Sequence, residues 1–157
     1  MSKVGRASRN ASFKRVETLG NGTSTAVGSE KVITAAESGE TYFIDHNHAS
    51  ALTITLPPLK EGAYFKFIWK TDMTANGTVV INSADNTAGD FAGSVLEQIT
   101  GGSNADSAFQ AFVNHDILTI SDDIDPGSYL ECVCDGSTWF WTGVLSVSAV
   151  GLIASST

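Results

Sequence analysis

Short apolar runs alternate with turn-forming residues along most of the chain. From residue 31 to residue 83, and again from residue 116, a run returns every ten to fifteen residues, and pairs such as Asn76-Gly77 and Asp135-Gly136 separate nearly all of them. This cadence is typical of short β-strands in a sandwich or barrel, and nothing in it indicates strands that alternate with helices. We therefore predict one all-β domain, a β-sandwich or barrel. The predicted strands are Lys31–Ala36, Thr41–His46, Ala51–Leu56, Ala63–Lys70, Thr78–Ser83, Asp116–Ser121, Ser128–Cys134 and Thr138–Val144.

Alternation inside the runs assigns one face of each predicted strand to a core. Leu52–Leu56 and Phe65–Trp69 each place a large apolar residue at every second position, and successive strand residues point to opposite faces. The last strand differs, because Trp139 and Trp141 oppose Phe140. Large aromatic residues on both faces indicate that both faces are covered. The cover is either a second sheet of the same chain or a neighbouring subunit, and we favour the subunit.

The pattern divides the chain into three parts. Residues 1–30 show no apolar period and are predicted to be an extended basic N-terminal arm. Residues 31–145 are the predicted sandwich body, and residues 146–157 an apolar C-terminal tail that packs against something. The segment Asn86–His115 is the least regular part of the body. It shows a weak helical spacing, interrupted by glycine, and we expect a long excursion with short β or helical pieces in it; the spaced residues are Phe91, Val95, Leu96 and Ile99.

Charge separates the predicted arm from the body. The first fifteen residues hold five of the nine bases and no acid, whereas all 17 acids follow from Glu17 onward. An acidic body repels nucleic acid, while a basic arm is suited to an anionic surface on another protein. The alternative is a solvated, disordered terminus. If the arm binds, its candidate contact residues are Lys3, Arg6, Arg9, Lys14 and Arg15.

The C-terminal part carries the candidate residues for contact between subunits. After Asp135 the chain has no charged residue, and its apolar side chains call for a packing partner. We predict a subunit interface formed by the terminal hairpin and the residues that follow it. The candidates are Tyr129, Phe140, Val144, Leu145 and Val147.

Three groups of residues could bind a metal, and each has a simpler interpretation. His46 and His48 share a strand face, as in metal-binding cupins, but no carboxylate follows at the required spacing, so we interpret them as exposed turn residues. The acidic turn around Asp123 lacks the length and closing glutamate of an EF-hand, and is interpreted as solvated. Cys132 and Cys134 are interpreted as small buried apolar residues. No metal or other cofactor is predicted.

Signatures of catalysis, secretion and membrane insertion are missing from the sequence. It contains no nucleophile elbow, P-loop, dinucleotide fingerprint or zinc-protease motif, and we predict a protein without enzymatic activity or catalytic residues. No apolar run follows Met1, and no stretch of 18 apolar residues occurs. We expect synthesis in a cytoplasm and no membrane partner.

Residues 41–145 resemble a group of small virion proteins of tailed bacteriophages. The resemblance rests on four elements in a fixed order: a strand ending in Leu56-Pro57, the Gly62–Lys70 strand, the Gly77–Asp85 strand and the Gly127–Gly143 hairpin with its Asp-Gly turn and tryptophans. Each element alone is unspecific, and residues 1–30 and 86–115 fall outside the pattern.

The resemblance implies a capsid decoration (cement) protein. Such a protein is β-rich and often trimeric, and it stabilises the head by bridging units of the major capsid protein on its outer surface. Related modules serve as head fibres or tail proteins, so a fibre or adsorption module that binds host glycans is the main alternative. A cupin-like metal-binding protein is the other. We expect a homotrimer made in the bacterial host cytoplasm and placed on the outside of the capsid.

Overall fold

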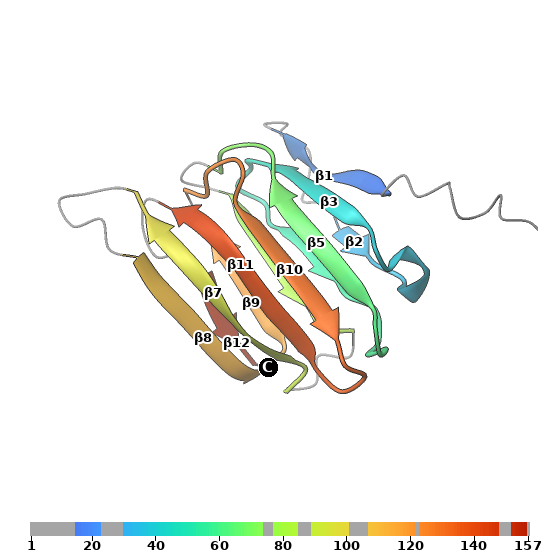
Figure 1. The fold of residues 1–157 in the computed structure, drawn as a ribbon. Coiled ribbons are helices and arrows are strands. Elements are labelled where there is room, and N and C mark those ends of the chain that lie inside the picture. Colours follow the sequence, from blue (N-terminus) through green and yellow to red (C-terminus); the bar gives the residue numbers. More distant parts are fainter. Residues whose placement is uncertain are drawn as a thin grey trace, which may run out of the picture.

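The computed structural model describes residues 15–22, 30–73, 77–84, 89–100, 107–121, 123–147 and 152–156. Two mixed β-sheets pack face to face, with the seven-stranded sheet in front and the five-stranded sheet behind it in Figure 1. The prediction of an all-β sandwich is confirmed. The strands are β1 (Val16–Gly22), β2 (Glu30–Val32), β3 (Thr41–His46), β4 (Leu52–Thr55), β5 (Tyr64–Trp69), β6 (Thr78–Asn82), β7 (Phe91–Ile99), β8 (Ser107–His115), β9 (Ile117–Ser121), β10 (Tyr129–Cys134), β11 (Trp139–Val147) and β12 (Leu152–Ser155).

From β1 to β6 the chain alternates between the two sheets. The larger sheet has the order β1-β3-β5-β10-β11-β7-β8, and the smaller has the order β12-β9-β6-β4-β2. As a result β1, β3 and β5 pair in parallel in one layer, while β2, β4 and β6 pair in parallel in the other. Up to β6, each apolar run therefore lies in the opposite sheet from the run before it. Beyond β6 this alternation ends, because β9 shares the smaller sheet with β6, and β10 and β11 share the larger sheet.

The core lies between an aromatic layer and an aliphatic layer. The inner face of the larger sheet presents rings that contact one another, with Tyr42 stacked on Phe67 at 5.5 Å and Phe91 edge-on to Trp141 at 5.4 Å between centroids. Such ring pairs add to the energy of burial. The smaller sheet faces them with buried aliphatic side chains, namely Leu52, Ile54, Val79, Ile81, Leu118 and Ile120.

The segment that showed a helical spacing forms a β-hairpin instead. β7 and β8 pair antiparallel along nine residues each, and β7 also pairs in parallel with β11. The inward positions of β7 include Gly93 and the fully buried Glu97, which hide the two-residue alternation of a strand. Of the β and helical pieces that the sequence left open for this segment, the structure shows β, in two strands of nine residues each, and no helix at residues 91–99.

Both ends of the predicted body extend further than the sequence indicates. Residues 16–22, assigned to the arm, form the edge strand β1, which pairs with β3. Leu152–Ser155, assigned to the tail, pair antiparallel with β9 in the smaller sheet. The tail thus packs on its own chain, and the folded part runs at least from β1 to β12. Residues 1–14 lie outside the described residues.

Candidate association surface

The outer face of the seven-stranded sheet, which points away from the smaller sheet, carries apolar side chains in rows. One row crosses six strands through directly paired positions and is called here the first apolar row. A second apolar row crosses five of the same strands, from β5 to β8 in sheet order. The first row is Phe43, Ile68, Tyr129, Val144, Leu96 and Phe109; the second is Tyr64, Val133, Phe140, Ala92 and Val113.

Among the described residues, the second row is largely open to solvent, whereas the first row is half-buried except at Phe109. Phe109 is 74% exposed, Val113 64%, Val133 50%, and Tyr64 and Phe140 nearly half. An open hollow of about 250 Å³ lies in the second row, and Tyr64 and Phe140 are among its lining residues. Contiguous exposed apolar area of this kind marks surfaces that bind another molecule. The outer face is therefore the candidate functional surface.

A polar row separates the two apolar rows. It runs through Lys66, Glu131, Thr142 and Ser94 to Ala111. The Lys66 ammonium donates a hydrogen bond to the Glu131 carboxylate and lies 4.5 Å from the centre of the Tyr129 ring. The charges of this row thus neutralise each other, and the cation–π contact ties the polar row to the first apolar row.

The residues predicted to form a subunit interface divide between the two faces of β10 and β11. Tyr129, Phe140 and Val144 belong to the outer rows, which is consistent with a role in contact. Leu145 and Val147 are fully buried in the core of the chain itself. Since neighbouring strand residues point to opposite faces, these two share the inner face with Trp139 and Trp141. They are core residues and are not available to a second subunit.

Of the predicted arm contacts, the structure describes Arg15. Its guanidinium donates to Glu40 at 3.3 Å while the side chain remains 72% exposed. Lys3, Arg6, Arg9 and Lys14 lie outside the described residues. The contact of the basic arm with another protein therefore stays a prediction.

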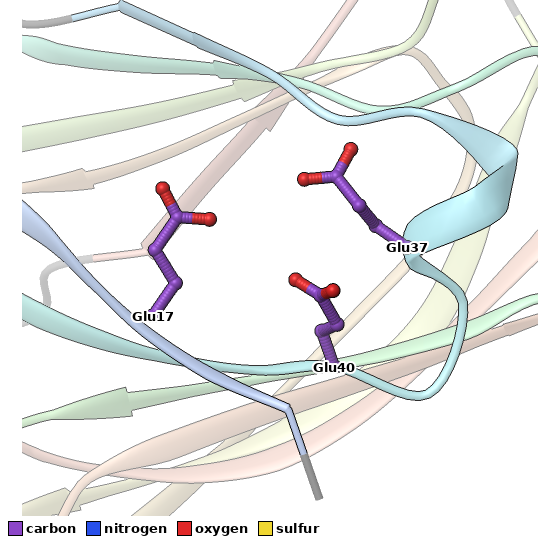
Figure 2. A group of neighbouring side chains, drawn as sticks. All are labelled: Glu17, Glu37 and Glu40. Carbon is purple, nitrogen blue, oxygen red and sulfur yellow. The ribbon is translucent and has the colours of Figure 1, made fainter.

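Three carboxylates from different elements point into one space at the β1 edge, as Figure 2 shows: Glu17 of β1, Glu37 of the short 3-10 helix Ala35–Glu37, and Glu40 before β3. Their oxygens lie within 4.8 Å of one another, and among the described residues this is the one group of three that could hold a metal ion. However, the Lys31 ammonium donates to both Glu17 and Glu37 at 2.7 Å. We interpret the group as an ion-pair network.

The network has a structural consequence, because it joins the two layers. Lys31 belongs to β2 of the smaller sheet and Glu17 to β1 of the larger. Burial alone would raise the pKa of Glu37, but hydrogen bonds from Lys31 and Thr34 outweigh it and lower that pKa to about 2. Burial likewise opposes the charge on Lys31, yet its two carboxylate partners raise its pKa. The network therefore connects the two sheets at the edge formed by β1 and β2.

His46 and His48 converge on one backbone segment. The buried His46 ring places Nε2 2.8 Å from the carbonyl oxygen of Ser50, and Nδ1 of His48 accepts the Ser50 N–H at 3.0 Å. Burial lowers the pKa of His46. Within the described residues no third ligand joins this pair, so the geometry is that of a hydrogen-bonded turn. The expectation of exposed histidines is wrong, because His46 is fully buried and His48 is half-buried.

The other candidate chemical groups are occupied by contacts within the chain. The Asp125 carboxylate accepts the Ser146 hydroxyl at 2.6 Å, and Asp122 lies outside the described residues. Cys132 and Cys134 are free and buried, as predicted, and burial raises the pKa of the Cys132 thiol. No helix among the described residues is long and apolar enough to cross a membrane.

Comparison of the chain with models of known protein families finds no match, and comparisons with curated proteins and with solved structures find none either. Three features of the chain therefore bear on its function: the outer face, the charge distribution and the sequence resemblance.

Proposed function

We propose that this chain is a non-enzymatic structural protein of a tailed-bacteriophage virion. In this proposal it decorates the outer surface of the head as a trimer and stabilises the shell of major capsid protein. The observation that supports it most is the outer face, whose two apolar rows are suited to protein–protein contact. The sequence resemblance adds the location on the virion, which the geometry does not address.

In the proposed assembly, Tyr129, Phe140 and Val144 contribute to the contact between subunits, and the basic arm contacts the capsid. A protein that binds only the assembled shell stabilises that shell by mass action. Three arms on one trimer strengthen a weak single contact, because the second and third bind at high effective concentration. The formally neutral pair Lys66–Glu131 keeps the contact surface free of net charge.

The test uses undecorated heads of the virus that encodes the chain. Sedimentation with heads would be compared for the wild type and for a variant in which the four cations Lys3, Arg6, Arg9 and Lys14 become glutamine. Arg15 is kept, because its bond to Glu40 belongs to the folded body. The control replaces the exposed Lys60 with glutamine, which changes charge outside the arm. Wild type and control should bind, and the arm variant should bind weakly or not at all.

Two results would refute the parts of this proposal separately. Wild-type protein that leaves heads undecorated under all salt conditions contradicts the decoration role. An arm variant that binds as well as wild type contradicts the role of the arm.

A second candidate function draws on the hollow in the second apolar row. Tyr64 and Phe140 stand at its rim, each nearly half exposed, beside the carboxylate of Glu131. Exposed aromatic rings next to an acceptor could stack on a sugar, as in a glycan-binding adsorption module. Binding of the wild type to a glycan on an array, with no binding by Tyr64→Ala, would favour this function over decoration.

A further inference from the structure

β8 differs from the other strands at the edges of the two sheets. The edges are β1 and β8 in the larger sheet and β2 and β12 in the smaller. β1 is interrupted by a register shift and carries Glu17, while β2 and β12 have three and four residues. β8 has nine residues without a charge or a proline, and its ladder with β7 is irregular only at the last step, beside His115.

Natural sheet edges are protected from pairing by charges, prolines, bulges or short length. β8 has none of these devices between Ser107 and Val113. Its outward-facing residues are Phe109, Ala111 and Val113, all exposed, and the two large ones end the first and second apolar rows. Among the described residues, both the unpaired backbone of this edge and its exposed apolar side chains are therefore available to another β-strand.

We propose that β8 pairs antiparallel with β8 of a second copy of this chain, about a two-fold axis at Ala111. In this register each Phe109 stands opposite Val113 of the second copy, an aromatic and β-branched pair of the kind that stabilises antiparallel strands. The first apolar row of one copy then continues into the second apolar row of the other. The two outer faces become one continuous face.

Charge supports a second copy as the occupant. Residues 16–157 hold all 17 acids and four of the nine bases, so two bodies repel each other over most of their surface. β8 brings no charge to the contact, and its outer-face neighbours on β7, Ala92, Ser94 and Leu96, are also uncharged. A two-fold axis brings like residues together, and this uncharged edge is where like residues meet without repulsion.

The contact goes beyond the proposed function and does not depend on it. An edge-to-edge pair leaves the outer face uncovered, so a three-fold contact and this two-fold contact use different groups. If the chain is otherwise monomeric, the pair is a dimer of 16.5 kDa subunits. If it is also trimeric, the pair joins two trimers.

The test replaces Ala111 with lysine in one variant and with glutamate in another. At the two-fold axis, like charges stand directly opposite each other, so each variant alone should dissociate about tenfold more readily than wild type. An equimolar mixture of Ala111→Lys and Ala111→Glu should restore pairing, and native mass spectrometry should find the mixed pair. Ala111 is exposed, so circular dichroism should show both variants folded like wild type.

Ser94→Lys is the matched control. Ser94 is the partner of Ala111 on β7, one strand further from the axis. Three strand spacings, about 14 Å, then separate the two new lysines, which is beyond the screening length of about 8–10 Å in physiological salt. This variant should pair like wild type.

Wild type should give even-numbered species at roughly 100 μM, a concentration suited to a weak contact. Wild type that shows only monomers or trimers overturns the inference, as does an equimolar mixture that forms no mixed pair. The head-binding experiment is read independently. Protein that pairs through β8 and ignores heads supports this inference and refutes decoration.

Discussion

Gly93 of β7 occupies a place where the sandwich has no room for a side chain. It pairs with Trp141 of β11, and a Cβ atom at residue 93 would lie 2.3 Å from the Trp141 carbonyl oxygen and 2.8 Å from the Trp141 Cβ. Real Cβ atoms stay at least 3.0 Å from other atoms, and the obstacle here is backbone. The substitution Gly93→Ala therefore forces β7 away from β11.

The cost follows from the size of that displacement. Relieving the 2.3 Å contact to 3.0 Å moves the strands apart by about 0.7 Å, which stretches ladder bonds of about 2.9 Å to about 3.6 Å, no longer hydrogen bonds. Two adjacent bonds with buried groups left unsatisfied cost about 2–6 kcal/mol. Removing a glycine returns about 0.5–1 kcal/mol through the unfolded state. We expect a net loss of about 3 kcal/mol, a large share of the ~5–15 kcal/mol that stabilises a typical domain.

Urea unfolding followed by tryptophan fluorescence measures this loss, since Trp69, Trp139 and Trp141 are all buried. With a denaturant slope of about 2 kcal/mol per molar, the midpoint should fall by about 1.5 M. Ser94→Ala, one residue away on the exposed outer face, should change stability by no more than ~0.5 kcal/mol. A Gly93→Ala midpoint within about 0.3 M of wild type would show that β7 and β11 are not packed as described.

Three further predictions follow from other parts of the molecule. The pKa of Glu37 is lowered from 4.5 to about 2, so its ion pairs stabilise the fold by at most about 3 kcal/mol above pH 4.5. That contribution is lost as the pH falls toward 2. Glu37→Gln should make the free energy of unfolding less dependent on pH in urea titrations at pH 6, 4 and 3. Phe140→Glu should weaken self-association at least about tenfold without lowering the unfolding midpoint, because it places charge in the second apolar row. Val32→Glu, at a more exposed position on β2, should leave association unchanged in analytical ultracentrifugation. Deleting residues 152–157 should lower the free energy of unfolding by about 3 kcal/mol or more, because β12 is lost from the smaller sheet. The buried Glu97 carboxylate also loses the hydrogen bond that it accepts from the Leu152 N–H at 2.6 Å. An unchanged temperature of thermal unfolding would contradict the role of β12 in the smaller sheet.

Much of the strand content could be predicted, because apolar alternation and turn residues are local signals. Thr41–His46 was predicted with the bounds that the structure shows, and five of the other seven runs differ by at most one residue at each end. β1, β7, β8 and β12 escaped prediction. In β7 the inward positions of Gly93 and Glu97 broke the alternation, and in β1 glycine and polar residues left few apolar positions. β12 has four residues, and its apolar residues are consecutive and show no alternation.

The candidate surface needed the strand order, which no local pattern contains. Tyr129, Phe140 and Val144 were predicted because they lie on one hairpin. Phe43 and Phe109 lie at opposite ends of the first apolar row, and only the pairing of six strands places them in one row. Leu145 was assigned to the interface for its apolar character, although its alternation with Val144 placed it in the core. Residues that are distant in sequence and adjacent in space could not be linked in advance.

The alternation of β1 to β6 between the two sheets has a consequence for how the chain folds as it leaves the ribosome. β5 pairs with β10 on its second side and β6 with β9, and both partners lie later in the chain. At a synthesis rate of about 5–20 residues per second, the roughly sixty residues between β5 and β10 take about 3–12 s to appear. During that time β5 and β6 are temporary edges of a half-built sandwich. At this stage the nascent chain is most exposed to pairing with a wrong strand. The yield of folded protein should therefore depend on how quickly the second half of the chain is synthesised.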